Sequence, residues 1–190
     1  MHVLEPYYNW RHLYIASEDE YSPFYGYHNS ETEFTHAIYN FVIHPQWDSI
    51  DSPTLFMKVL YVNYNTGVAV IELIGEWNDT HYDDVRNFKE TVIDPLLDNG
   101  VNKHILIGEN VLILHPDDDS YYEQWFEDCN EQDGWVTLLN FRDHVLQSFE
   151  EIGVDQYFIS GGTLTDLAWR TKEPETLFEE VDSIVSKRLA

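Results

Sequence analysis

The chain has 190 residues, and its 35 acidic residues against ten basic ones give a net charge of -25 at pH 7. This balance argues against binding to nucleic acid or to an anionic membrane, because both depend on clustered lysine and arginine. The single cysteine, Cys129, excludes an intramolecular disulfide and a cysteine-based zinc site. No apolar run approaches the roughly 20 residues of a membrane span, and no signal peptide is visible, so we expect a cytoplasmic protein.

Aromatic residues crowd the first 54 positions and set this segment apart from the rest of the chain. The stretches 12–17 and 35–43 are typical of strands, and a loop lies between them. We therefore expect residues 1–54 to form a β-rich extension, a hairpin that packs on the core. The alternative is that the extension forms an aromatic binding surface. Residues 55–190 are expected to form the core domain.

Strands and helices alternate in the core. The expected strands are 54–63, 68–75, 103–108, 135–141 and 154–159. Apolar residues recur every three or four positions in the stretches 82–96, 122–129, 145–152 and 177–185, which predicts amphipathic helices. Pro95 is expected to bend or end the first helix, and Pro174 to open the last one. The order predicts an α/β fold, with a mostly parallel or mixed sheet covered by helices and an extra C-terminal helix.

A short repeat indicates where a site would lie. Leu73 to Trp77 reads LIGEW, and LIGEN follows 33 residues later, the size of one βαβ unit. If both copies end buried strands, Glu76 and Glu109 lie at the edge where open α/β sheets bind ligands. The expected binding edge comprises Glu76, Asn78, Glu109, Asn110, Asn140 and Arg142. The alternative is that these residues only form turns and helix caps.

The stretch HPDDDSYYEQW, from His115 to Trp125, allows two interpretations from its residues alone. Ser120 and Glu123 have the spacing of a capping box, and acidic residues are favoured at the start of a helix. The other interpretation is a site for a divalent cation, since hard cations take carboxylate oxygens. The candidate metal ligands are Glu76, Glu109, His115, Asp117 and Asp119.

The hairpin, the pattern VAVIELIGEW and the ending GWVTLLNFRDHVLQSFEEIGVDQYF resemble an anti-sigma-factor antagonist (STAS-like) domain over about residues 55–160. The resemblance implies a small α/β regulatory module that binds partner proteins. In many members a serine at the start of the second helix, within an Asp-Ser-(Ser/Thr)-Gly motif, is phosphorylated. Asp119 and Ser120 match this motif, whereas Tyr121 and Tyr122 depart from it. Ser120 is therefore a candidate phosphoacceptor.

The sequence thus favours a non-catalytic, cytoplasmic regulatory module that binds a protein partner, for which the acidic surface suits a basic one. We expect no cofactor. One alternative is a divalent-metal-dependent enzyme or binding protein that uses the carboxylates of the strand-end edge. Another is a homo-oligomer assembled through the aromatic N-terminal segment.

Overall fold

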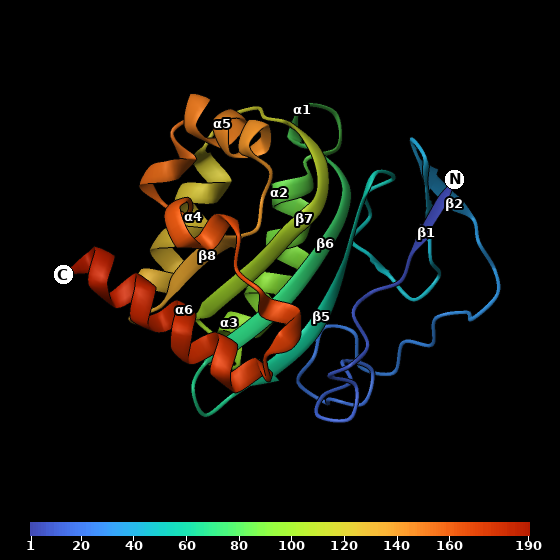
Figure 1. The fold of residues 1–190 in the computed structure, drawn as a ribbon, viewed down its shortest axis with the longest axis horizontal. Helices are drawn as coiled ribbons and strands as arrows, with labels where there is room; N and C mark the ends of the chain where they lie inside the picture. Colours follow the sequence, from blue (N-terminus) through green and yellow to red (C-terminus); the bar gives the residue numbers. More distant parts are fainter.

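A mixed five-stranded sheet with the order β4-β5-β6-β7-β8 forms the centre of the protein (Figure 1). The strands are β4 (Asp48–Ser49), β5 (Leu55–Asn63), β6 (Val68–Asn78), β7 (Lys103–His115) and β8 (Trp135–Leu139). The β4–β5 and β5–β6 pairs are antiparallel, and the β6–β7 and β7–β8 pairs are parallel. This computed structural model describes residues 1–190, and it confirms the expected α/β class and the hairpin that opens the core.

Helices cover both faces of this sheet. The first layer comprises α1 (Asp79–Tyr82), α2 (Asp84–Phe88), the π-helical turn η1 (Lys89–Ile93), α3 (Asp94–Asp98), α4 (Ser120–Asn130) and α5 (Asp143–Glu151). On the other face lies α6 (Pro174–Leu189), visible in front of the sheet in Figure 1. Three short 3-10 turns connect α5 to α6: η2 (Val154–Gln156), η3 (Gly162–Thr165) and η4 (Trp169–Thr171). None of the helices has the length and apolar composition that a membrane crossing needs.

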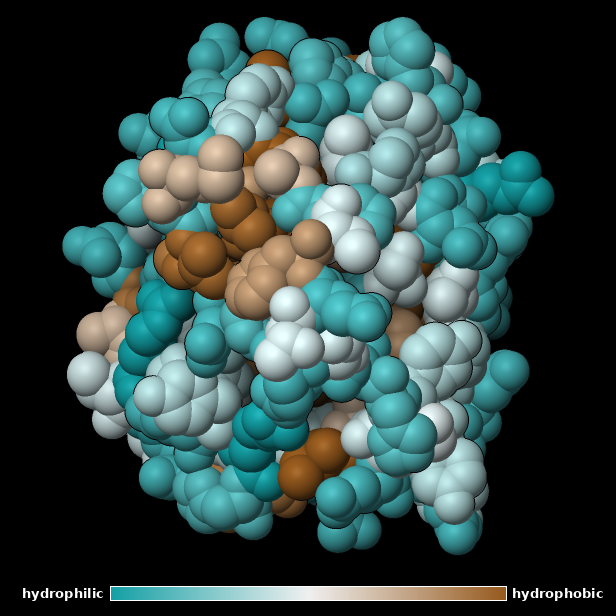
Figure 2. Space-filling view, turned by 90° about the vertical axis from the view of Figure 1, so that its right-hand side faces the viewer, coloured by the Kyte–Doolittle hydropathy of each residue, from teal (hydrophilic) through white to brown (hydrophobic).

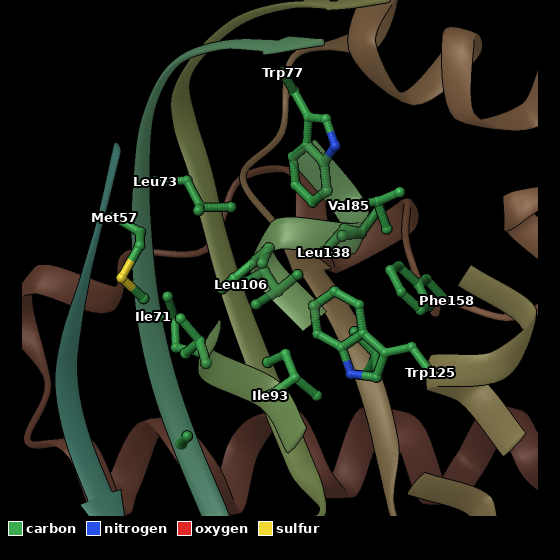
Figure 3. Close-up of a cluster of buried hydrophobic side chains, with 14 of the residues drawn as sticks. Met57, Ile71, Leu73, Trp77, Val85, Ile93, Leu106, Trp125, Leu138 and Phe158 are labelled. Atoms are coloured by element: carbon green, nitrogen blue, oxygen red, sulfur yellow. The ribbon is translucent and has the colours of Figure 1, made fainter. Parts of the chain in front are cut away.

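Successive side chains along the strands point to opposite faces of the sheet, which explains why helices pack on both faces. Ile71 and Leu73 of β6 point into the larger apolar cluster, whereas Val68 and Val70 point into the cluster beneath α6. Figure 3 shows the larger cluster, in which side chains of the strands meet the indole of Trp125 and the ring of Phe158. Burying one such side chain contributes about 1.5–3 kcal/mol. The sheet therefore needs cover on both faces.

Within the first 54 residues, three short strands form a smaller sheet with the order β1-β3-β2: β1 (His2–Leu4), β2 (His36–Ile38) and β3 (Phe41–Ile43). The rest of the segment is turns and loops, apart from β4, which joins the central sheet. The expected strand at 35–43 is thus a tight hairpin of two strands, with Tyr39 at φ 52° in its turn. The strand expected at 12–17 is wrong, since this stretch forms turns. The carbonyl of Trp10 accepts the N–H groups of Leu13 and Tyr14, which draws the chain into a helical turn.

The helix expected at 82–96 runs from Asp84 to Asp98 as α2, η1 and α3, and it is separated from the short α1 by Asp83, which adopts a left-handed conformation with φ 52°. Side chains hold this break, because Asp79 Oδ1 accepts the N–H of Val85. Pro95 does not end the helix. It lies in the first turn of α3, where a missing N–H is tolerated, and the π-helical turn η1 precedes it directly.

The short strand expected at 154–159 is also largely absent. Residues Val154–Gln156 form the 3-10 turn η2, and only Ile159 pairs with the sheet, through an isolated parallel bridge to Thr137 of β8. The edge of β8 is therefore covered by a single bridge and the backbone bonds beside it.

Gly75 is a position where the fold requires glycine, and replacing it tests the junction of β5 with β6. Its φ is +118°, and a Cβ there would collide with the carbonyl oxygen of Thr54. We expect Gly75→Ala to lower the free energy of unfolding by at least about 2 kcal/mol, measured by urea denaturation. Gly26→Ala is the matched control: its φ is also positive, at +74°, but its Cβ would meet open space. Equal losses in the two variants would contradict the steric explanation.

Candidate functional site

The two glutamates of the LIGE repeat do not share an edge, so that prediction is wrong. Strand β7 continues past residue 108 to His115, and two irregularities shift its register against β6. As a result Glu76 lies opposite Ile113, while Glu109 is in the interior of the strand. The extension has a physical cause: Val111 and Leu114 find apolar partners in the core, so continued pairing buries them.

Glu76 and its neighbours form a polar cluster at the ends of β6 and β7. The Glu76 carboxylate accepts the Tyr39 hydroxyl at 2.8 Å and the Asn78 amide at 3.1 Å. His115 Nε2 lies 3.4 Å from Glu76 Oε1. Asn78 Oδ1 in turn accepts the N–H of His81 at 3.0 Å and caps α1. The structure thus brings Glu76, Asn78 and His115 together, and Tyr39 joins this edge to the small sheet.

Two buried aspartates lie beneath this edge. Asp79 accepts the indole N–H of Trp77 at 2.9 Å and the hydroxyl of Tyr122 from α4. Asp84 accepts the backbone N–H of Asn78 at 2.8 Å. Burial raises the pKa of each carboxyl to about 6. These residues hold the break between α1 and α2 against the sheet and α4, which is a structural role.

Glu109 belongs to a different cluster, on the face covered by α6. Arg170 contacts the Glu109 carboxylate, and its Nη2 lies 3.4 Å from Glu72 Oε1. Glu72 Oε2 also accepts the N–H of Tyr7 at 2.8 Å. The guanidinium of Arg170 stacks on the ring of Trp169, at 4.4 Å from its centroid. The cluster therefore joins the sheet to segments from both ends of the chain.

Burial raises the pKa of Glu72 to about 7, and the Tyr7 N–H and the Arg170 charge only partly oppose this. Sequence reasoning did not select Glu72 or Arg170. A signal for Glu72 was present, since it is the one charged residue in the otherwise apolar stretch VAVIELIG. Nothing local marked Arg170 as its partner.

The remaining residues of the expected binding edge serve the chain itself. Asn140 makes two hydrogen bonds to the backbone of Leu167, at 2.9 and 2.8 Å. Arg142 donates to the carbonyl of Glu109 at 3.2 Å. Asn110 is half-buried within β7, opposite Ile74. Glu76 and Asn78 thus share the Glu76 cluster, Glu109 and Asn140 contact the 162–170 segment, and Asn110 and Arg142 join neither group, so the structure does not assemble the six residues into one edge.

At the start of α4, the expected capping box is wrong. Ser120 is the first residue of the helix, and both its hydroxyl and its N–H donate to Asp118 Oδ1. The N–H of Glu123 instead bonds to the carbonyl of Asp119 at 2.9 Å. Asp119 occupies the N-cap position, so Ser120 lies one residue too late to cap the helix. Ser120 itself is exposed.

The candidate metal ligands do not converge. No three His, Cys, Asp or Glu side chains lie in an arrangement that could hold a metal ion. Glu109 is paired with Arg170, and Asp119 Oδ2 accepts the Tyr157 hydroxyl at 3.2 Å. The long β7 strand separates Glu109 from Glu76, so the set Glu76, Glu109, His115, Asp117 and Asp119 is not one site.

No protein-family model matches the sequence, and no curated protein matches it. Among solved structures, the chain is similar to the anti-sigma factor antagonist SpoIIAA in its unphosphorylated form. The identity is 17%, the TM-score is 0.47, and the match covers 67% of this chain and 96% of that one. A phosphorylated SpoIIAA from Bacillus gives 15% identity and a TM-score of 0.42, over 66% of this chain and 98% of that one.

A protein of Thermotoga maritima, described as an anti-sigma factor antagonist, is 18% identical with a TM-score of 0.44. That match covers 66% of this chain and 92% of the other. These structures belong to the STAS-like class that the sequence pattern resembles. At identities of 15–18% and TM-scores below 0.5, the likeness assigns neither a family nor a role to this chain.

The raised pKa of Glu72 predicts a pH-dependent stability. Between its ordinary pKa of 4.5 and about 7, the folded protein keeps a proton that the unfolded chain releases. The free energy of unfolding should therefore fall as the pH rises through this window. The side chain in Glu72→Gln still accepts the Tyr7 N–H but cannot ionise. We therefore expect the free energy of unfolding of this variant to fall less with rising pH, by up to about 3 kcal/mol.

Urea denaturation at pH 4.5 and pH 8 measures the effect. Glu131→Gln is the matched control, because Glu131 is exposed and has no hydrogen-bonded or ion-paired side-chain partner. If Glu72→Gln and Glu131→Gln show the same change of stability with pH as the unsubstituted protein, Glu72 does not titrate in this window.

Proposed function

We propose that this protein is a regulatory module that binds a protein partner through the outer surface of its first 54 residues. One observation carries the proposal: nine of the eleven exposed large hydrophobic side chains lie in this segment. They are Met1, Val3, Tyr8, Leu13, Tyr21, Tyr25, Tyr27, Phe34 and Tyr39. Gathered apolar side chains on a surface mark interaction sites, and tyrosine and phenylalanine are enriched in the buried centres of interfaces.

The small sheet contributes an apolar outer face to this surface. Val3, Val42 and Ala37 lie side by side in register across its three strands. Val3 and Ala37 are exposed, whereas Ile38 and Ile43 on the opposite face are buried against the core. Strands β1 and β2 both have an unpaired edge. Figure 2 shows this side of the molecule, on which apolar side chains gather among hydrophilic ones.

Charge supports a basic partner. Residues 1–54 contain eight acidic side chains and a single basic one, Arg11, and the whole chain carries a charge of -25. A basic surface on the partner would speed the encounter and orient it, with an effect that salt screens. The cytoplasm is the proposed location.

A non-catalytic role agrees with the geometry of the carboxylates. Glu76 and Glu109, the two carboxylates expected at one edge, lie in separate clusters and cannot act together on one substrate. The sequence pattern that resembles the anti-sigma-factor antagonist family points to regulation as well. Ser120, exposed at the start of α4, remains a predicted phosphoacceptor in this scheme.

Site-specific photocrosslinking in the source cells tests the proposal. A photoreactive phenylalanine analogue at Tyr39 should give a discrete covalent adduct with another protein. When the crosslinking is repeated in a cell lysate, added salt should lower the yield of this adduct, because salt screens the attraction between the two surfaces. The same analogue at Leu189 is the control, because Leu189 is equally exposed but lies at the end of α6. Identical adducts at both positions, or none at Tyr39, would count against the proposal. An adduct of two copies of this chain would instead favour the oligomer.

A further inference from the structure

A pocket of about 210 Å³ lies between the N-terminal segment and strand β5. Lys58, Val59 and Leu60 line it from the strand, and residues of the 5–17 and 24–31 stretches line it from above. Its aromatic lining consists of Tyr7, Tyr8, Tyr14, Phe24 and Tyr27. Tyr8 and Tyr27 keep free hydroxyls, whereas the Tyr7 and Tyr14 hydroxyls donate to groups of the chain. The pocket is separate from the Glu76 cluster.

Asp48 and Lys58 form an ion pair in the wall of this pocket. Asp48 is only 3% exposed, and its Oδ1 accepts the Asn29 amide at 2.6 Å. Oδ2 lies 3.0 Å from Lys58 Nζ, so the carboxylate is paired with the ammonium, and the Lys58 side chain keeps 23% of its surface exposed. The Lys58 ammonium has three donor hydrogens, so it can donate to a ligand hydroxyl while Asp48 holds it in place.

The walls around this ion pair are fixed in place. Asn29 is held through Asp48, and its carbonyl accepts the amide of Gln46 at 3.2 Å. Gln46 Nε2 also donates to the carbonyl of Ser30 at 3.1 Å. Lys58 stands on a central part of β5, so its position is set by the sheet. The polar groups are therefore organised before any ligand arrives.

The charges in the pocket are mixed. Arg11 and Lys58 are cationic, and Glu5, Glu31 and Asp48 are anionic. Arg11 is one of five arginines, and it is the one whose guanidinium makes no hydrogen bond or ion pair within the chain. A charged ligand would be attracted by one of these two groups of side chains and repelled by the other. A neutral molecule with hydroxyl groups would suit both groups, because each hydroxyl both donates and accepts.

Size limits the ligand further. Pockets for drug-sized molecules measure about 300–1,000 Å³, so this one suits a single ring rather than a nucleotide. We propose that the pocket binds a neutral, polyhydroxylated single-ring molecule, a monosaccharide or cyclic polyol. Lys58, held by Asp48, donates to one hydroxyl, Arg11 donates to another, and the C–H face of the ring packs on the tyrosine rings.

Saturation-transfer NMR on the full chain tests this site, with glucose, galactose, mannose and myo-inositol as probes at millimolar concentrations. We expect at least one probe to bind. Tyr8→Ala and Asp48→Asn should each weaken that binding by about tenfold or more. Tyr25→Ala is the matched control, because Tyr25 is an exposed tyrosine of the same segment that does not line the pocket.

The melting temperature of each variant shows whether it is folded. Tyr8 is exposed, so Tyr8→Ala keeps the test valid if Asp48→Asn unfolds the protein. Glucose 6-phosphate and glucosamine report the charge preference. The proposal is overturned if no neutral probe binds, if only a charged probe binds, or if Tyr25→Ala weakens binding as much as Tyr8→Ala.

Discussion

The whole structure depends on burying both faces of the five-stranded sheet. Strands β6 and β7 are apolar on either side, so a single layer of helices would leave half of their surface in water. Helices α2 to α5 and η1 cover one face. The other face is covered by α6 and Trp169 from the end of the chain, together with Trp10 from its beginning. Both ends of the chain are thereby part of the core.

A polar contact holds this second layer in register with the sheet. Glu72 stands in the middle of β6, where it accepts the N–H of Tyr7 and pairs with Arg170. The hydroxyl of Tyr7 donates to the carbonyl of Arg170 at 2.8 Å, and the indole of Trp10 donates to the carbonyl of Lys172 at 3.1 Å. A buried carboxylate is costly unless it is paired, so these partners specify how the two end segments cross the sheet.

The aromatic extension has an inner and an outer side. Its Trp10, Phe24 and Trp47 are buried in three different apolar clusters, which makes the segment continuous with the core. Its outer tyrosines and Val3 remain exposed, and the pocket at Lys58 lies between the two sides. A partner surface and a small-ligand pocket would therefore share one segment. Binding at either would act on residues that the other uses, since Tyr8 and Tyr27 belong to both.

The sequence by itself determined the elements whose signals are short-range. The hairpin at residues 55–78, the helices α4 to α6 and the α/β class follow from apolar periodicity and turn residues, which need no distant partner. The sequence also predicted that Glu76, Asn78 and His115 belong to sites at the strand ends. It grouped Glu76 with Asn78 in the binding edge and Glu76 with His115 among the metal ligands, each time together with residues that lie elsewhere.

Only the tertiary structure decided register and partnership. The irregularities in β7 move Glu109 away from Glu76, because burying Val111 and Leu114 outweighs ending the strand at the glutamate. Arg170 meets Glu72 across 98 residues of chain, and Asp48 meets Lys58 across the edge of the sheet. Such contacts depend on which surfaces pack together, and this cannot be predicted from the local sequence pattern.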